Sequence, residues 1–227
     1  MKERPILFSG PMVRAILEGR KTQTRRPVKP QPPAYIDELY GGELRQRAPY
    51  QLECHESGCV LGYGFEDDNG QLYQCPFGVP GDRLWVRETF GLGWRDGCGG
   101  YSALRPTGEQ YDRPDKVFFK ADFPDDDEKN GKRCWRPSIH MPRWASRITL
   151  EVVSVRVERV RDISEEDAQA EGVEWPAPWS GVGGVTHPTC IDAFRELWES
   201  VYGAESWHSN QWVWVVEFNR VEQGGVK

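Results

Sequence analysis

The sequence ITLEVVSVRVERV at residues 148–160 has the clearest strand pattern of the chain. Apolar side chains recur at every second position, as they do in a strand that turns one face toward a core. The phase of this alternation changes between Val152 and Val153, which predicts a β-bulge or a strong bend. Because closed barrels are built from bent strands, the segment favours a curved β-structure.

Further elements are predicted on both sides of this strand. Strand patterns occur at residues 5–8, 83–90, 116–120 and 212–218. Two short apolar runs within residues 54–75 flank a turn at residues 67–70 and predict a hairpin. Helical spacing or capping signals predict short helices at residues 11–19, 163–173 and 190–202.

Strands outnumber helices in this reading, and residues 91–115 read as a loop because they are rich in glycine and polar side chains. Many bent strands around one small core are typical of a β-barrel. We therefore expect a mainly β (α+β) fold in which a barrel carries a few short helices.

Composition narrows the class of protein. No apolar run in the 227 residues is long enough to span a bilayer, and the N-terminus lacks the apolar stretch of a signal peptide. The six cysteines are scattered and lack the dense spacing of a secreted disulfide scaffold. We expect a cytoplasmic protein with reduced thiols and no membrane partner.

Basic residues concentrate at the N-terminal end, although the net charge is −6. Residues 1–30 contain eight Lys or Arg residues against two Glu residues, and the motif GRKTQTRR occupies residues 19–26. Because Gly19 ends a helical pattern, we expect the motif on an exposed loop. Such a loop suits a nucleotide-like anion or a short piece of nucleic acid, or it is simply a solvated basic turn.

No metal or cofactor site is predicted. Cys54, His55, Cys59 and Cys75 are possible zinc ligands, but they lack the paired Cys-x-x-Cys spacing of a strong zinc signal. The sequence also contains no phosphate-binding P-loop, dinucleotide fingerprint or nucleophile elbow.

Four pieces of the chain, in this order, resemble the ASCH domain family, whose fold is a small β-barrel related to the PUA domain. They are the motif GRKTQTRR, the turn and strand PGDRLWV at residues 80–86, the helix at 163–173 and the strand at 212–218. The chain is also similar to the longer ASCH proteins of phages and prophages. The resemblance implies one PUA-like domain over residues 1–227, with insertions near 30–75, 91–140 and 174–188.

Small bacterial ASCH enzymes hydrolyse N4-acetylcytidine, and the resemblance places their catalytic residues on Lys21, Thr24 and Glu171. The implied reaction is amide hydrolysis of N4-acetylcytidine, or of a related N4-acylated cytosine, without a cofactor. Thr24 would attack or hold the water, Lys21 would activate that hydroxyl, and Glu171 would move the proton or stabilise the lysine. Which of Lys21 and Glu171 is the base stays open.

Five further residues are candidates for contact with the substrate: Arg20, Arg25, Arg26, Glu88 and Trp144. The three arginines belong to the basic motif, where Arg26 would clamp an anion or stack on a base. Glu88 shares a strand face with apolar neighbours, so its carboxylate lies at a barrel mouth or in an ion pair. Trp144, near two arginines, is the best candidate for stacking on a base.

Two other functions fit the same residues. The chain would serve as a non-catalytic module that binds RNA or a modified base through the basic motif, or as a ribonuclease. The expected partner is therefore a modified nucleoside or single-stranded RNA, and the sequence does not define the oligomeric state.

Overall fold

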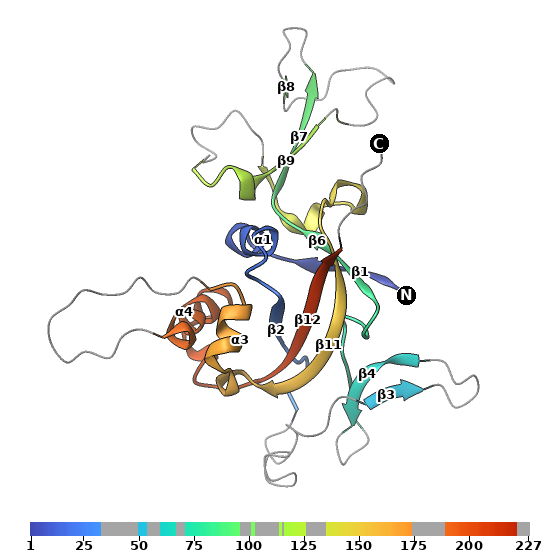
Figure 1. The fold of residues 1–227 in the computed structure, drawn as a ribbon, viewed down its shortest axis with the longest axis vertical. Coiled ribbons are helices and arrows are strands. Elements are labelled where there is room, and N and C mark those ends of the chain that lie inside the picture. The colour runs from blue at the N-terminus through green and yellow to red at the C-terminus, as the bar shows by residue number, and fades with distance from the viewer. Residues whose placement is uncertain are drawn as a thin grey trace, which may run out of the picture.

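The computed structural model describes residues 1–32, 50–53, 60–66, 71–95, 101–102, 114, 116–125, 135–173 and 189–221. The chain is mixed α/β with more strand than helix (Figure 1), in agreement with the expected predominance of strands. The strands are β1 (Glu3–Leu7), β2 (Gln23–Pro27), β3 (Tyr50–Glu53), β4 (Val60–Glu66), β5 (Leu72–Gln74), β6 (Arg83–Arg87), β7 (Phe90–Arg95), β8 (Tyr101–Ser102), β9 (Lys116–Phe119), β10 (Trp135–Arg136), β11 (Thr149–Arg159) and β12 (Trp212–Val221). The described helices are α1 (Gly10–Leu17), α3 (Glu165–Ala170) and α4 (Cys190–Tyr202), with 3-10 turns η3 (Lys120–Asp122), η4 (Ser138–His140), η5 (Arg143–Ala145), η6 (Val160–Asp162) and η7 (Ala204–Ser206).

A five-stranded sheet in the order β1-β6-β11-β12-β2 forms the centre of the molecule. β1 and β6 are parallel, and the other neighbouring strands are antiparallel. The register of β11 against β12 shifts between Val152 and Ser154, which confirms the predicted bulge. The extra residue reverses the alternation, so that Val152 and Val155 both belong to the main core.

The sheet is curved, and β11 and β12 bend along their length (Figure 1). β1 and β2 are its two edge strands, and no pairing between them closes a barrel among the described residues. The PUA-like barrel therefore remains a prediction.

The described helices begin and end at capping residues. Gly19 follows α1 with a φ of +77°, and Gly172 follows α3 with a φ of +82°, a region that favours glycine. At the start of α3, the Ser164 hydroxyl accepts a hydrogen bond of 3.1 Å from the Asp167 N–H, as its sequence predicts. None of the helices that the structure describes is long and apolar enough to cross a membrane.

Apolar side chains pack on both faces of the sheet. The main core on one face combines side chains of β6, β11 and β12 with those of α1 and of the hairpin β4–β5. On the other face, Phe194 and Trp198 of α4 pack with Val213 and Val215 of β12. Side chains of α1, of the edge strand β2 and of α4 line one cavity, and the candidate site lies there.

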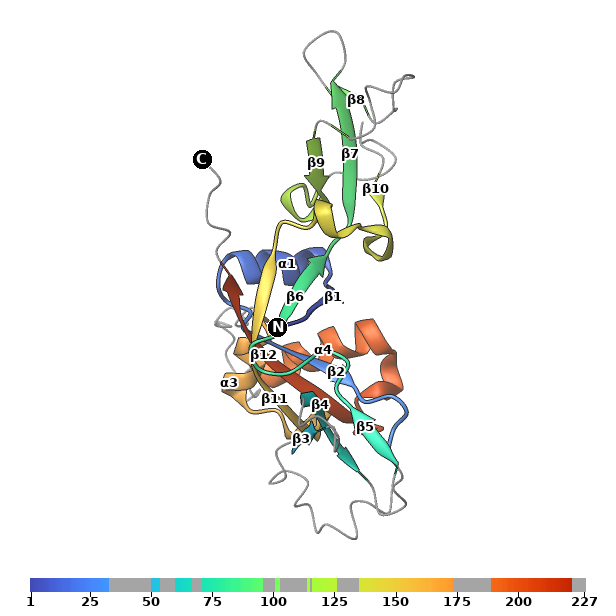
Figure 2. The same ribbon diagram turned by 90° about the vertical axis from the view of Figure 1, so that its right-hand side faces the viewer.

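The prediction of a loop at residues 91–115 is wrong in part. β7 begins at Phe90 and pairs with β8, β9 and β10 to form a four-stranded sheet. Gly91 and Gly93 alternate with larger residues, and without side chains they hide the two-residue period from sequence inspection. Figure 2 shows this sheet extending from one end of the molecule, with β3, β4 and β5 at the other end.

The predicted hairpin within residues 54–75 corresponds to β4 and β5, which pair in antiparallel fashion. The turn predicted at residues 67–70 lies outside the described residues.

Candidate functional site

The basic motif at residues 19–26 is only in part the exposed loop that its sequence predicts, because Gly19, Arg20 and Thr22 alone are exposed. Its second half belongs to β2, which pairs with β12. Lys21, Thr24 and Arg25 are only 2–3% exposed. The local prediction fails because the carboxylates that neutralise the buried cations lie 133 to 150 residues later in the chain.

The Lys21 ammonium is completely buried beside Glu171. Its Nζ atom donates to the carboxylate Oε2 and to the carbonyl oxygen of Glu171, both at 2.8 Å. The backbones of the two residues also form an isolated antiparallel bridge. A Cβ atom at Gly172 would lie 2.7 Å from the Lys21 Cβ atom and 2.8 Å from the Ala15 Cβ atom. The backbone bridge and this close packing both hold Lys21 against the end of α3.

Arg25 is a second buried cation at the same carboxylate. Its Nη1 atom donates to Glu171 Oε1 at 3.3 Å, and its Nη2 atom donates to Glu158 Oε1 at 2.6 Å and to Asp167 Oδ2 at 2.7 Å. Arg156 of β11 donates to the same Asp167 oxygen at 2.9 Å. This network joins β2, β11 and α3, and it leaves the Glu171 carboxylate between two buried cations.

Burial changes how these groups bind protons. Desolvation lowers the pKa of Lys21, and the charge and hydrogen bond of Glu171 offset only part of that shift. Desolvation raises the pKa of Glu158 in spite of the nearby Arg25. At Asp167 desolvation acts upward, but the hydrogen bond and charge of Arg25 outweigh it, so the pKa is lowered. Lys21 is thus a lysine that releases its proton more readily than an exposed one.

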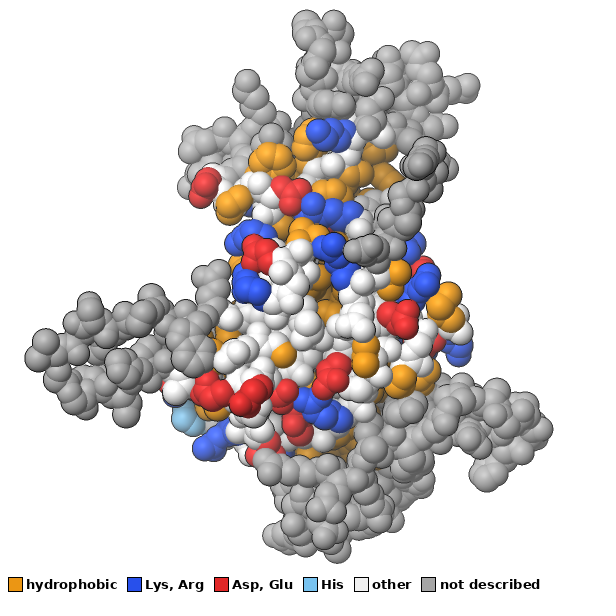
Figure 3. Space-filling view, in the orientation of Figure 1, with side chains coloured by type: hydrophobic (Ala, Val, Ile, Leu, Met, Phe, Trp, Pro, Cys, Tyr) orange, Lys and Arg blue, Asp and Glu red, His pale blue; other side chains and the backbone are white. Residues whose placement is uncertain are grey.

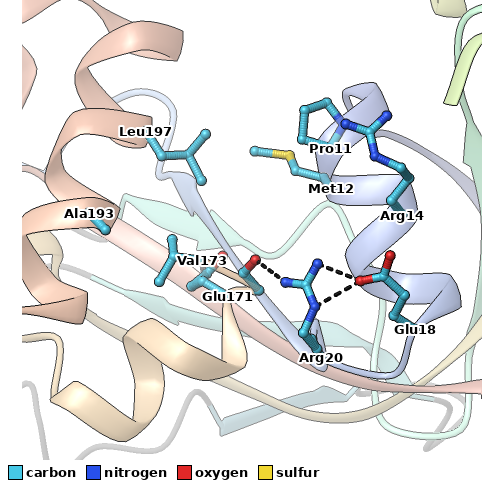
Figure 4. A pocket seen from close by; sticks show the side chains of 10 residues that line it. Pro11, Met12, Arg14, Glu18, Arg20, Glu171, Val173, Ala193 and Leu197 are labelled. Atoms are coloured by element: carbon cyan, nitrogen blue, oxygen red, sulfur yellow. Dashed lines mark hydrogen bonds and ion pairs between the residues drawn. The ribbon is translucent and has the colours of Figure 1, made fainter. Parts of the chain in front are cut away.

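Two adjoining cavities open between α1 and α4, and Glu171 lies at both. The larger has a volume of about 330 Å³ and is lined by Pro11, Met12, Arg14, Glu18, Arg20, Glu171, Gly172, Val173, Ala193 and Leu197 (Figure 4). The smaller has a volume of about 20 Å³ and is lined by Met12, Thr24, Arg25, Arg26, Glu171, Phe194, Leu197, Trp198, Val201 and Tyr202. Because they share Met12, Glu171 and Leu197, we treat them as one site, the α1–α4 groove.

The groove brings together most of the residues predicted for the site. Thr24, Arg25 and Arg26 line its smaller cavity, and Arg20 lines the larger one. Arg20 donates to the Gly172 carbonyl at 2.9 Å and to the Glu18 carboxylate (Figure 4). The Arg26 guanidinium lies 5.3 Å from the centre of the Phe8 ring. Lys21 does not line either cavity and contacts the groove through Glu171.

Glu88 and Trp144 do not line the α1–α4 groove. Of the two predicted surroundings of Glu88, the structure has the ion pair: its carboxylate accepts two hydrogen bonds from Arg147, at 3.0 and 3.1 Å. Arg147 also binds Asp122 and lies 3.9 Å from the centre of the Phe119 ring. This cluster fastens β9 and η3 to the end of β6. Trp144, in η5, is 58% exposed.

The sequence predicts α4 only as a packed helix and misses its part in the groove. Phe194, Leu197, Trp198 and Val201 have the i, i+3, i+4, i+7 spacing of one apolar face, and all four line the smaller cavity. Phe194 and Trp198 also pack against the sheet. Val201 remains 49% exposed although it is apolar. The apolar stripe of α4 can be read from the sequence, but the sequence does not show that part of the stripe faces a cavity instead of the sheet.

Among the described residues, no group of three or more His, Cys, Asp or Glu side chains is placed to hold a metal ion. Cys54, His55 and Cys59 lie outside the described residues. Cys75 is buried, and desolvation raises the pKa of its thiol to about 12. Acidic side chains gather over α3 and the adjoining part of β11, and Lys and Arg side chains over α1 and β6 (Figure 3).

The chain matches no protein-family model and has no significant match among curated proteins or solved structures.

Proposed function

We propose that the α1–α4 groove binds an N-acylated nucleobase and hydrolyses its amide bond, with N4-acetylcytidine as the reference substrate. The observation that carries the proposal is the placement of the Glu171 carboxylate at both cavities, fixed by Lys21 at 2.8 Å and Arg25 at 3.3 Å. The resemblance to ASCH domains and their PUA-like barrel supports the same assignment, because it selects Lys21, Thr24 and Glu171 independently of the cavities.

The two cavities suit the two reactants. A volume of about 330 Å³ lies within the range of small-molecule sites, so the larger cavity has room for the acylated base. The smaller cavity, at about 20 Å³, matches one water molecule, which needs polar neighbours to stay bound. Thr24, Arg25 and Glu171 supply such neighbours at its wall. We assign this cavity to the attacking water.

In the proposed reaction, the oxygen of this water bonds to the acyl carbon and the carbon–nitrogen bond breaks. Glu171 accepts one proton of the water and delivers it to the exocyclic nitrogen, which leaves as the amine of cytidine. The acyl group leaves as a carboxylic acid, which releases the second proton to solvent and becomes a carboxylate. Arg25 and Arg26 stabilise the negative charge that develops on the acyl oxygen. Lys21 holds Glu171 in position and does not touch the substrate. In this proposal Glu171, and not Lys21, is therefore the general base.

A second candidate function is recognition of a modified base without catalysis. The complete burial of Lys21 favours it, because a lysine that reaches neither cavity cannot contact a substrate. In that case the network around Glu171 would serve only to hold the groove in shape.

The test is release of cytidine from N4-acetylcytidine, followed by liquid chromatography. We expect the Glu171→Gln variant to lose about 100-fold or more of the rate, the usual effect of removing a general base. Glu158→Gln is the matched control, because Glu158 also binds Arg25 but does not line the groove. The control should keep most of the activity of the wild type.

Two results would contradict the enzymatic role. If the folded wild type releases no cytidine, yet the nucleoside binds in calorimetry, the groove is a recognition site. If both carboxylate variants lose activity equally, Glu171 acts through stability alone. Thermal melting of each variant separates loss of folding from loss of chemistry.

A further inference from the structure

A second surface with binding chemistry lies outside the groove, on the outer face of β1 and β6. The alternation of β6 buries Leu84 and Val86, which are 0–1% exposed, in the main core. Arg83, Trp85 and Arg87 therefore lie on the opposite face of the strand. Val13 and Ile16 of α1 pack in the same core as Leu84 and Val86, so the outward face of β6 points away from α1.

Two arginines flank the indole of Trp85 on this face. The Cζ atoms of Arg87 and Arg143 lie 5.4 and 5.9 Å from the ring centre, within the range of cation–π contacts. The Nε atom of Arg143 also donates to Glu3 of β1 at 2.9 Å. The next residue along the chain is Trp144, whose side chain is largely in solvent. Guanidinium groups therefore border the Trp85 indole, and an exposed second indole follows Arg143 directly in the chain.

Positive charge on this face exceeds negative charge. Arg83 and Arg87 form no ion pair with the part of the chain that the structure describes, and the Nε atom of each is buried without a hydrogen-bond partner. Among the described residues, two acids lie beside these arginines. Glu3 binds Arg143 and also interacts with the charge of Arg83, and Glu151 lies across from Arg83 in the pairing of β6 with β11. Three arginines against two glutamates leave cationic groups available for an anionic partner.

We propose that this surface, made of Arg83, Trp85, Arg87, Arg143 and Trp144, binds a single-stranded nucleic acid; we call it the arginine–tryptophan face. Guanidinium groups bind phosphates, and an exposed indole stacks on a base that is not paired in a duplex. A duplex hides its bases, and an acidic peptide has no bases to stack, so neither uses Trp144. The site is separate from the α1–α4 groove and does not depend on the hydrolysis proposed there.

The test is fluorescence anisotropy of the full chain with labelled 12-nucleotide single strands of DNA and RNA, over a range of salt concentrations. We expect Trp144→Ala to weaken binding about 5- to 100-fold, as loss of one stacking platform does. Arg83→Ala and Arg87→Ala should each reduce the slope of log K against log salt by about 0.7, the value for one phosphate contact on a single strand.

Matched controls lie elsewhere on the surface. Leu72→Ala removes a side chain that is 45% exposed on β5, and Arg161→Ala removes an exposed arginine of η6; both should bind within about 2-fold of the wild type. Glu171→Gln should bind normally, which separates this proposal from the hydrolase. The proposal is overturned if no oligonucleotide binds, if the face variants bind like the controls, or if a duplex or polyglutamate competes as well as the single strand.

Discussion

Gly172→Ala tests whether close packing behind Glu171 holds the site together. At this position φ is +82°, and an added Cβ atom would meet the Cβ atoms of Lys21 and Ala15 at 2.7 and 2.8 Å. The left-handed backbone costs a non-glycine residue about 1–2 kcal/mol. Overpacking a buried contact adds about 1–3 kcal/mol. We therefore expect the free energy of unfolding to fall by about 2–5 kcal/mol.

Gly19→Ala separates these two contributions. Gly19 has nearly the same φ, +77°, but nothing lies within 4 Å of the position of its Cβ atom. This variant should lose only the backbone cost, about 1–2 kcal/mol. The difference between the two variants measures the contact of Gly172 with Lys21 and Ala15.

Urea denaturation at pH 7, followed by tryptophan fluorescence, gives both free energies from the midpoint and the slope. The reasoning is refuted if Gly172→Ala is no less stable than Gly19→Ala. In that case the approach of α1 to the end of α3 is loose enough to accept a methyl group. The position of Lys21 against Glu171 would then not depend on this glycine.

Two further predictions concern carboxylates that hold the sheets together. Asp82 has a pKa below its ordinary value of 3.8, because hydrogen bonds from the Lys2 N–H and Arg4 and the charge of Arg4 outweigh desolvation, which alone would raise it. The stabilisation by Asp82 is therefore fully present above about pH 3.8 and is lost as the pH falls through the lower pKa of the folded state. Asp82→Asn should lower the free energy of unfolding by about 1–3 kcal/mol at pH 7. The variant should also lose less stability than the wild type when the pH is lowered below 3.8 in urea unfolding curves. Glu88→Gln should lower stability by a similar amount, about 1–3 kcal/mol, because Arg147 loses a buried partner. The rate of N4-acetylcytidine hydrolysis per folded molecule of this variant should match that of the wild type. A loss of rate without a loss of stability would indicate that Glu88 contacts the substrate.

Patterns within single elements could be read from the sequence. The bulge in β11 follows from the shift in alternation at Val152, and the start of α3 follows from Ser164 and Asp167. Both depend on residues within a few positions of one another. β7 escaped detection, because the glycines within it carry no side chains to show the period.

The surroundings of the basic motif could not be predicted in the same way. Its sequence alone favours an exposed cationic loop, since three arginines and a lysine are costly to bury without partners. The partners exist, but Glu158, Asp167 and Glu171 belong to β11 and to α3 and its C-terminal end, and only the pairing of β2 with β12 brings Arg25 to them.

The sequence by itself determined the bend of the long strand, the capped helices and the residue types available for chemistry, because these depend on local propensity and spacing. Only the tertiary structure decided that Lys21 and Arg25 are buried cations, that Glu171 lies between them at the wall of two cavities, and that Glu88 is bound by Arg147. The physical reason is that the cost of burying a charge is set by which opposite charge folding places beside it, and that partner is distant in the chain.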